Sequence, residues 1–262
     1  MQQITSKDNN LIKEIKKLKE KKYRNEKGLF IIEGFRFLEE ALKSSFHIEQ
    51  ILISETGLDK FNEYNLNNLI KSHSKIYLIP DNIFKNIAST DNPQGVIGVA
   101  KIKVLEYNFN FNDTYVLVDK VQDPGNLGTI IRTAHAAASA GVIITKGTVD
   151  VYNEKTLRST MGSIFNIPII EDKDLSFVKE LMSKGYKLVC SSLDTEYNFY
   201  DINFNEKIII SVGNEGNGVS KEVYDISDIK VKIPMPGGAE SLNAAVAASI
   251  MIYEGVRQKN DK

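Results

Sequence analysis

Three short polar loops hold the side chains best suited to chemistry in this sequence. They read DPGNLG at 123–128, GNEGNGVS at 213–220 and PMPGGAESLN at 234–243, and each follows an apolar run. Amide, carboxylate and hydroxyl groups in such loops can bind a ligand or orient a reacting group. In open α/β sheets, ligands bind outside the carboxyl ends of the strands, where these loops gather. We therefore expect the three loops to form one site.

The second loop partly matches a nucleotide-binding motif. GNEGNG satisfies the first six positions of the phosphate-binding loop G-x-x-x-x-G-K-[ST], but Val219 stands where the motif requires lysine. The dinucleotide motif G-x-G-x-x-G fails as well, because Gly216, Asn217 and Gly218 are followed by Val, Ser and Lys. Neither phosphate motif is complete, and a tight turn is the plain alternative for a glycine-rich segment.

The elements around these loops alternate between short β-rich runs and amphipathic helical stretches, which predicts an α/β protein with a largely parallel sheet. After DPGN we expect a helix with Asn126 at its N-cap, Arg132 on its polar face and Gly141 at its end. A last helix is predicted from Ser241, another good N-cap residue, to about Arg257.

A polar, Asn-rich segment at 105–113 separates two halves of the chain. Its lack of any clean hydrophobic period predicts a linker. We therefore expect two domains, one over residues 1–105 and one over residues 106–262.

Composition places the chain among globular proteins, with 42% hydrophobic and 26% charged residues. Cys190 is the single cysteine and the three histidines are scattered, so we expect no disulfide and no metal site. No apolar stretch approaches the roughly 20 residues that cross a bilayer, which favours a cytoplasmic protein without a membrane partner.

The net charge of −1 is unevenly spread, because residues 1–27 hold nine Lys and Arg against four Asp and Glu. A basic leading segment can reflect attraction to nucleic acid, but on charge alone a solvated helix face is the favoured interpretation. If it binds RNA, the candidate contacts are Lys13, Lys16, Lys17, Lys21 and Arg24.

Together the three loops resemble, in order and spacing, the motifs of the SpoU (TrmH) family of RNA 2′-O-ribose methyltransferases in the SPOUT superfamily. The matching segments are DPGNLGTIIRTA (123–134), SVGNEGNGVS (211–220) and IPMPGGAESLNAAVAASIMIYE (233–254). In the first half, FIIEGFRFLEEAL (30–42) and QGVIGVA (94–100) resemble that family's substrate-binding domain. The resemblance implies an N-terminal L30e-like α/β domain and a C-terminal α/β trefoil-knot (SPOUT) domain.

The resemblance also implies an activity, a cofactor and an assembly. The activity is S-adenosylmethionine-dependent 2′-O-methylation of a ribose in structured RNA, with 23S ribosomal RNA favoured, by a homodimer formed through the C-terminal domain. Arg132 would activate the hydroxyl, with Asn126, Glu215, Ser241 and Asn243 completing the catalytic site. The implied cofactor-binding residues are Ser191, Ser192, Leu193, Gly213, Asn214, Glu215, Gly216, Ile233, Met235, Ser241, Leu242 and Asn243.

Two roles stay open at the level of sequence. Arg132 could act as a base, which is awkward because guanidinium stays protonated in proteins, or it could clamp the phosphate beside the reacting ribose. Glu215 could orient Arg132 or the substrate, or could simply be a polar residue at a strand end. A catalytically silent RNA-binding or ribosome-assembly factor and a transfer RNA 2′-O-methyltransferase are the alternative functions.

Overall fold

The computed structural model describes residues 1–106 and 114–260, which form two compact units. The first contains Met1–Lys103 and Tyr152–Phe165, and the second contains Val104–Val151 and Asn166–Lys262. The segment Tyr152–Phe165 therefore packs in the first unit although it follows the expected boundary in sequence. Of the predicted linker at 105–113, residues 107–113 lie outside the described residues.

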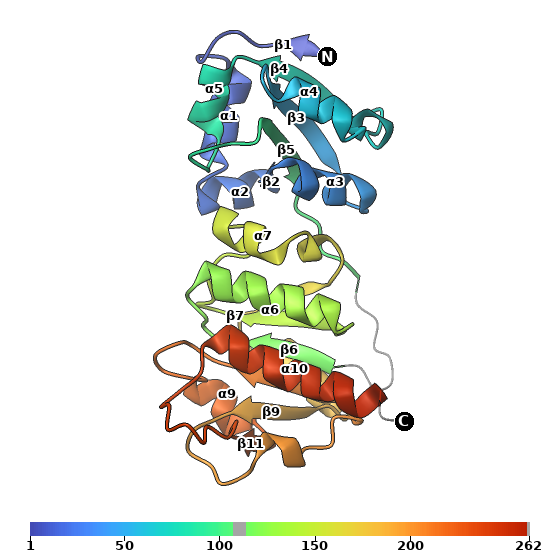
Figure 1. Cartoon of the computed structure of the whole chain (residues 1–262). Coiled ribbons are helices and arrows are strands. Elements are labelled where there is room, and N and C mark those ends of the chain that lie inside the picture. Colours follow the sequence, from blue (N-terminus) through green and yellow to red (C-terminus); the bar gives the residue numbers. More distant parts are fainter. Residues whose placement is uncertain (107–113, 261–262) are drawn as a thin grey trace. The chain divides into compact units, whose positions relative to one another are not determined.

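The first unit is built on a five-stranded mixed sheet in the order β1-β4-β3-β5-β2 (Figure 1). Its strands are β1 (Gln2–Gln3), β2 (Leu29–Glu33), β3 (Ile48–Ser54), β4 (Lys75–Ile79) and β5 (Val96–Lys101). Strand β5 runs antiparallel to both β2 and β3. The expectation of a largely parallel sheet is therefore wrong for this half, because hydrophobic alternation reports burial and not strand direction.

Helices cover both faces of this sheet, and their apolar stripes form its core. They are α1 (Asn10–Lys17), α2 (Lys21–Lys27), α3 (Phe35–Lys43), α4 (Leu58–Glu63), α5 (Asp81–Ile87) and α7 (Glu154–Thr160), with 3-10 turns η1 (Leu66–Asn68) and η2 (Ser163–Phe165). Ile12 and Ile15 of α1 pack with Phe84 of α5 on one face. Phe165 of η2 lies against Phe37 and Phe46, with ring centroids 5.1 Å apart in both pairs.

Arg24 is one of the predicted RNA-binding residues, but the structure places its side chain in the interior. It is 4% exposed, and its Nη1 donates to the carbonyl oxygens of Leu18 and Lys19 at 2.8 and 2.7 Å. Those carbonyls lie at the C-terminal end of α1, where helices leave acceptors without an intrahelical partner. Arg24 therefore joins α2 to α1, whereas Lys13, Lys16, Lys17 and Lys21 are exposed.

The second unit has a six-stranded sheet in which the described strand pairs are all parallel, as the sequence predicts. The order is β11-β9-β10-β6-β7-β8 (Figure 1). The strands are β6 (Thr114–Val118), β7 (Gly141–Thr145), β8 (Ile169–Asp172), β9 (Lys187–Ser191), β10 (Ile208–Val212) and β11 (Ile229–Val231). β10 and β6 are central and fully buried, which explains their continuous apolar runs.

Among the residues that the structure describes, four helices cover the second sheet. They are α6 (Pro124–Ala136), α8 (Ser176–Ser183), α9 (Lys221–Ile226) and α10 (Ala244–Asn260), with the short turn η3 (Phe199–Asp201). α8 and α9 share an apolar core with Ile209 of β10. α6 and α10 lie side by side across the sheet in Figure 1, and Thr133 and Ser249 hydrogen bond between them at 3.2 Å.

Both predicted N-caps of the site helices are wrong by a few residues. α6 begins at Pro124, and Asp123 is its cap, because Asp123 Oδ1 accepts from the Asn126 N–H at 2.8 Å. Pro124 suits the first helical position because that residue needs no hydrogen-bond donor. α6 ends at Ala136 and not at Gly141, which opens β7.

The last helix begins at Ala244 and not at Ser241. Asn243 Oδ1 accepts from the N–H groups of Ala245 and Val246 at 2.9 and 3.2 Å, so Asn243 fills the capping position. The Asn126 side chain is therefore left to hydrogen bond with Glu215 and Asn243.

Candidate functional site

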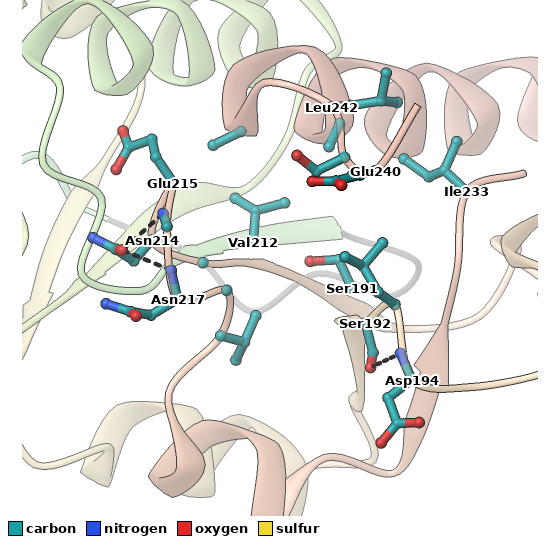
Figure 2. A pocket seen from close by; sticks show the side chains of 18 of the residues that line it. Ser191, Ser192, Asp194, Val212, Asn214, Glu215, Asn217, Ile233, Glu240 and Leu242 are labelled. Atoms are coloured by element: carbon teal, nitrogen blue, oxygen red, sulfur yellow. Dashed lines mark hydrogen bonds between the residues drawn. The ribbon is translucent and has the colours of Figure 1, made fainter. Parts of the chain in front are cut away.

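A pocket of about 520 Å³ opens at the carboxyl ends of β9, β10 and β11 (Figure 2). Ser191 ends β9, Val212 ends β10 and Val231 ends β11, and all three line it. The rest of the wall comes from the loops that follow these strands, from Tyr224 of α9 and from the start of α10. The volume is in the range of roughly 300–1,000 Å³ that small-molecule sites occupy.

Most of the predicted cofactor-binding residues line this pocket. They are Ser191, Ser192, Leu193, Gly213, Asn214, Glu215, Gly216, Ile233, Met235, Ser241 and Leu242. Asn243 is the exception, because its side chain caps α10 and donates to Asn126 of the first loop instead. Figure 2 shows Ile233 and Leu242 near one wall, with Ser191 and Ser192 across from Asn214 and Asn217.

Sequence reasoning missed Asp194 and Glu240, two carboxylates in the pocket wall. Glu240 lies inside the third motif, directly before Ser241. That position in the motif could have identified it as a pocket residue. Among the described residues that line the pocket there is no Lys, Arg or His. The wall is therefore acidic and suits a ligand that carries positive charge.

The GNEGNG segment is a closed turn and not a phosphate cradle. Asn214 and Gly218 exchange backbone hydrogen bonds at 2.8 and 2.9 Å, and Asn214 Oδ1 accepts from the N–H groups of Gly216 and Asn217, both at 3.0 Å. These donors point inward, so they cannot cradle a phosphate. The turn is tight at its base, because a Cβ on Gly213 would come within 3.0 Å of the Gly218 carbonyl group and of the Val219 nitrogen.

Glu215 connects the second loop to the first. Its Oε1 accepts from the Asp123 N–H at 3.1 Å and from Asn126 Nδ2 at 2.8 Å, and its Oε2 accepts from the Gln122 N–H at 3.1 Å. Asn126 Oδ1 in turn accepts from Asn243 Nδ2 at 2.9 Å. One chain of hydrogen bonds therefore joins all three motifs, from the start of α6 to the start of α10.

These bonds fix the protonation state of Glu215. Partial burial acts to raise the pKa of Glu215, but the hydrogen bonds from Asn126 and from the Gln122 and Asp123 N–H groups outweigh it and hold the pKa below its ordinary value of 4.5. Glu215 is therefore ionised at neutral pH. A carboxylate so well supplied with donors is a poor proton acceptor and a good structural anchor.

Arg132 lies two turns along α6 from Asn126, on the exposed side of the helix. Within the described part of the chain its guanidinium has no hydrogen bond or ion pair, so the alternative in which Glu215 orients Arg132 is not seen. Its five N–H donors are available to an external group. Such a planar fork matches the oxygens of a phosphate.

The sequence matches two family models over most of its length. The SpoU rRNA Methylase family matches residues 113–253, and the MRM3-like substrate binding domain matches residues 9–98. The chain belongs to the SpoU rRNA methylase family. The first match contains the whole hydrogen-bonded chain from Asn126 through Glu215 to Asn243.

Known rRNA methyltransferases match most of the chain. The 23S rRNA (guanosine(2553)-2′-O)-methyltransferase RlmP of Bacillus subtilis is 37% identical over 97% of this chain and 98% of its own. A 23S rRNA (uridine(2479)-2′-O)-methyltransferase of Streptomyces viridochromogenes is 28% identical over 90% and 85%. The crystal structure of an AdoMet-bound rRNA methyltransferase from Sinorhizobium meliloti has a TM-score of 0.86, with 30% identity over 98% and 97%.

The pocket of this SpoU protein fits S-adenosylmethionine by its own chemistry. The cofactor carries a cationic sulfonium and an ammonium group, which suit a wall that contains Asp194, Glu215 and Glu240. Its adenine is flat and apolar on both faces, which suits Ile233 and Leu242. The bound group would supply an electrophilic methyl, and the surrounding residues would bind and orient it.

Changing Glu215 to Gln is expected to destabilise the site in a pH-dependent way. At neutral pH we expect Glu215→Gln to lower the free energy of unfolding by about 1 kcal/mol, since solvent exposure weakens the bonds that it loses. Because the folded-state pKa of Glu215 lies below 4.5, the carboxylate's contribution is present above that pH and disappears as the pH falls through the folded value.

Denaturant unfolding of the wild type and Glu215→Gln, from neutral pH to well below pH 4.5, measures this contribution. The two stability curves should converge on the acid side. A constant difference across the whole range would contradict the ionised anchor.

Proposed function

We propose that this protein transfers a methyl group from S-adenosylmethionine to a ribose 2′-hydroxyl in ribosomal RNA, with 23S RNA as the substrate. The observation that carries the proposal is the acidic pocket beside a hydrogen-bonded chain that joins all three SpoU motifs. Membership in the SpoU rRNA methylase family and the full-length likeness to 23S rRNA 2′-O-methyltransferases support it.

The reaction is an in-line displacement for which the bound cofactor would supply the methyl group. As the ribose oxygen bonds to the methyl carbon, the carbon–sulfur bond of the sulfonium would break to leave a neutral thioether, and the hydroxyl proton would pass to water. The main requirement of the reaction is alignment of the two reactants. In this mechanism Arg132 clamps a phosphate next to the target ribose, and Asn126 and Glu215 fix the start of the helix that carries Arg132. Glu215 is not the base, because hydrogen bonds keep its pKa low.

The exposed lysines of α1 and α2 are proposed as the RNA-binding surface of the first unit, which matches a substrate binding domain. Neutralising Lys13, Lys16, Lys17 and Lys21 together is expected to weaken RNA binding and to flatten its dependence on salt. A plot of the logarithm of the binding constant against the logarithm of the salt concentration should become less steep. The slope should fall in magnitude by up to about 0.7–0.9 for each RNA phosphate that these lysines no longer neutralise.

Filter binding of unmodified ribosomal RNA at several salt concentrations measures this slope. Arg24→Ala provides the contrast, because Arg24 is buried and its removal should lower stability without changing the slope. An unchanged slope in the lysine variant would mean that the surface is only solvated.

A cytoplasmic homodimer whose second unit carries a trefoil knot completes the proposal. On α10, Val246 and Tyr253 are 47% and 49% exposed, and Leu242 just before the helix is 36% exposed. Such large apolar side chains on one helix suit contact with a second copy. Among the described residues, no helix has the length and apolar character needed to cross a membrane.

Methyl transfer from labelled S-adenosylmethionine to unmodified total RNA, followed by complete digestion and nucleoside analysis, tests the proposed function. Label in a 2′-O-methylnucleoside of the 23S fraction is the expected result. Label confined to transfer RNA would reassign the substrate. Absence of cofactor binding would instead indicate a silent RNA-binding or ribosome-assembly factor.

A further inference from the structure

A second hollow lies beside the GNEGNG loop, apart from the pocket described above. Its volume is about 390 Å³, and its chemically active lining residues are Lys120, Gln122, Lys146, Asn217 and Ser220. We call it the basic hollow, because it contains two lysines and, among the described residues that line it, no carboxylate.

The two cavities share one wall and have opposite charge. Asn214, Asn217 and Gly218 line both, so the closed turn of the second motif separates them. In Figure 2 the side chains of Asn214 and Asn217 extend away from Ser191 and Ser192. One side of the turn therefore suits a cation and the other suits an anion.

The rim of the basic hollow is fixed by hydrogen bonds before any ligand arrives. The Lys120 N–H donates to Thr145 Oγ1 and Thr148 Oγ1, both at 3.1 Å. The Lys120 carbonyl accepts from Gln122 Nε2 and Asn214 Nδ2, both at 3.0 Å. Lys120 adopts a left-handed backbone conformation with φ of 56°, which is uncommon for a residue with a side chain.

Three carboxylates lie near the hollow, those of Glu215, Glu222 and Asp119, and each already has a partner. Glu215 accepts from the Gln122 and Asp123 N–H groups and from Asn126 Nδ2. Glu222 lies 3.3 Å from Lys120 Nζ, but its side chain is 68% exposed and such surface pairs contribute little. Asp119 is fully buried, and its oxygens accept from Thr145 Oγ1 at 2.7 Å and from the Ser220 N–H at 2.6 Å. Lys146 is exposed and has no ion pair within the described residues.

We propose that the basic hollow binds a phosphate of the substrate RNA, next to the nucleotide that enters the reaction site. This inference rests on the proposed function, because the substrate RNA would bring a phosphate to this edge of the sheet together with the reacting ribose. Lysine is a compact point charge that suits phosphate. The hollow and the Arg132 guanidinium then hold RNA phosphates at separate positions around the cofactor pocket.

Lys120→Gln/Lys146→Gln is the test variant, and Lys173→Gln/Lys179→Gln is its matched control. The control removes the same charge from exposed positions in the same unit. We expect the test variant to bind an unmodified 23S RNA transcript about tenfold more weakly and to lower the salt slope by about 1, with the control close to wild type. Lys120→Arg/Lys146→Arg should restore most of the affinity.

Affinity for S-adenosylmethionine, measured by calorimetry on the same proteins, separates the possible anions. It should stay unchanged in the test variant. A loss of cofactor affinity would assign the hollow to the cofactor's carboxylate and overturn the proposal, and so would equal RNA binding by the test and control variants. RNA binding is measured without methyl transfer, so failure of the transfer assay in wild type is a distinct result that rejects the proposed function.

Discussion

Arg132→Ala should lower the rate of methyl transfer by about 100-fold or more, the usual cost of losing a group that stabilises a transition state. Arg132 is exposed and has no partner within the described residues, so its removal should leave folding and cofactor affinity unchanged. Single-turnover transfer at saturating S-adenosylmethionine, together with thermal unfolding, checks both parts.

Arg132→Lys distinguishes a clamp from a base. Lysine keeps the positive charge but not the bidentate fork, so a clamp should retain part of the activity. An unchanged rate in Arg132→Ala would remove Arg132 from the mechanism. A loss of cofactor binding in that variant would show that Arg132 acts through the pocket and not on the RNA.

Gly213→Ala should abolish tight binding of S-adenosylmethionine. The new methyl group would clash with the Gly218 carbonyl group and the Val219 nitrogen. These are backbone atoms, so no change of side-chain rotamer can relieve the clash. The turn must open to admit the methyl group, which moves Asn214 and Glu215 and breaks the connection to the first motif. We expect a destabilisation of about 1–3 kcal/mol from this overpacking.

Gly216→Ala is the matched control, because it adds the same methyl group to the same turn. There the Cβ would meet only Asn214 Oδ1 at 3.7 Å, an ordinary contact. Calorimetric titration with the cofactor and thermal unfolding should show Gly216→Ala close to wild type. Equal losses in both variants would indicate that any side chain in the turn obstructs the ligand directly.

Much of the second unit could be predicted from sequence, because buried parallel strands read as continuous apolar runs and the loops after them carry the polar residues. The runs TYVLV and IIISV are strands β6 and β10 as expected. Eleven of the predicted cofactor residues meet in one pocket because carboxyl ends of parallel strands share one sheet edge.

Features that depend on tertiary contact could not be read in the same way. Arg24 looks like any basic residue on a charged helix, and only the fold shows its guanidinium enclosed against α1. Glu215 was assigned alternative partners, and the structure joins it to Asn126 because Asp123 and not Asn126 caps α6. Hydrophobic spacing also carries no information on the direction of β5.

The placement of Tyr152–Phe165 in the first unit limits how this protein can be divided. The ring of Phe165 lies against Phe37 and Phe46, and Tyr152 lies against Phe30 at 4.8 Å between centroids. A fragment cut near residue 105 would lose these partners and expose an aromatic surface. The first unit is therefore not a transplantable module, and chimeras between relatives should exchange both segments together.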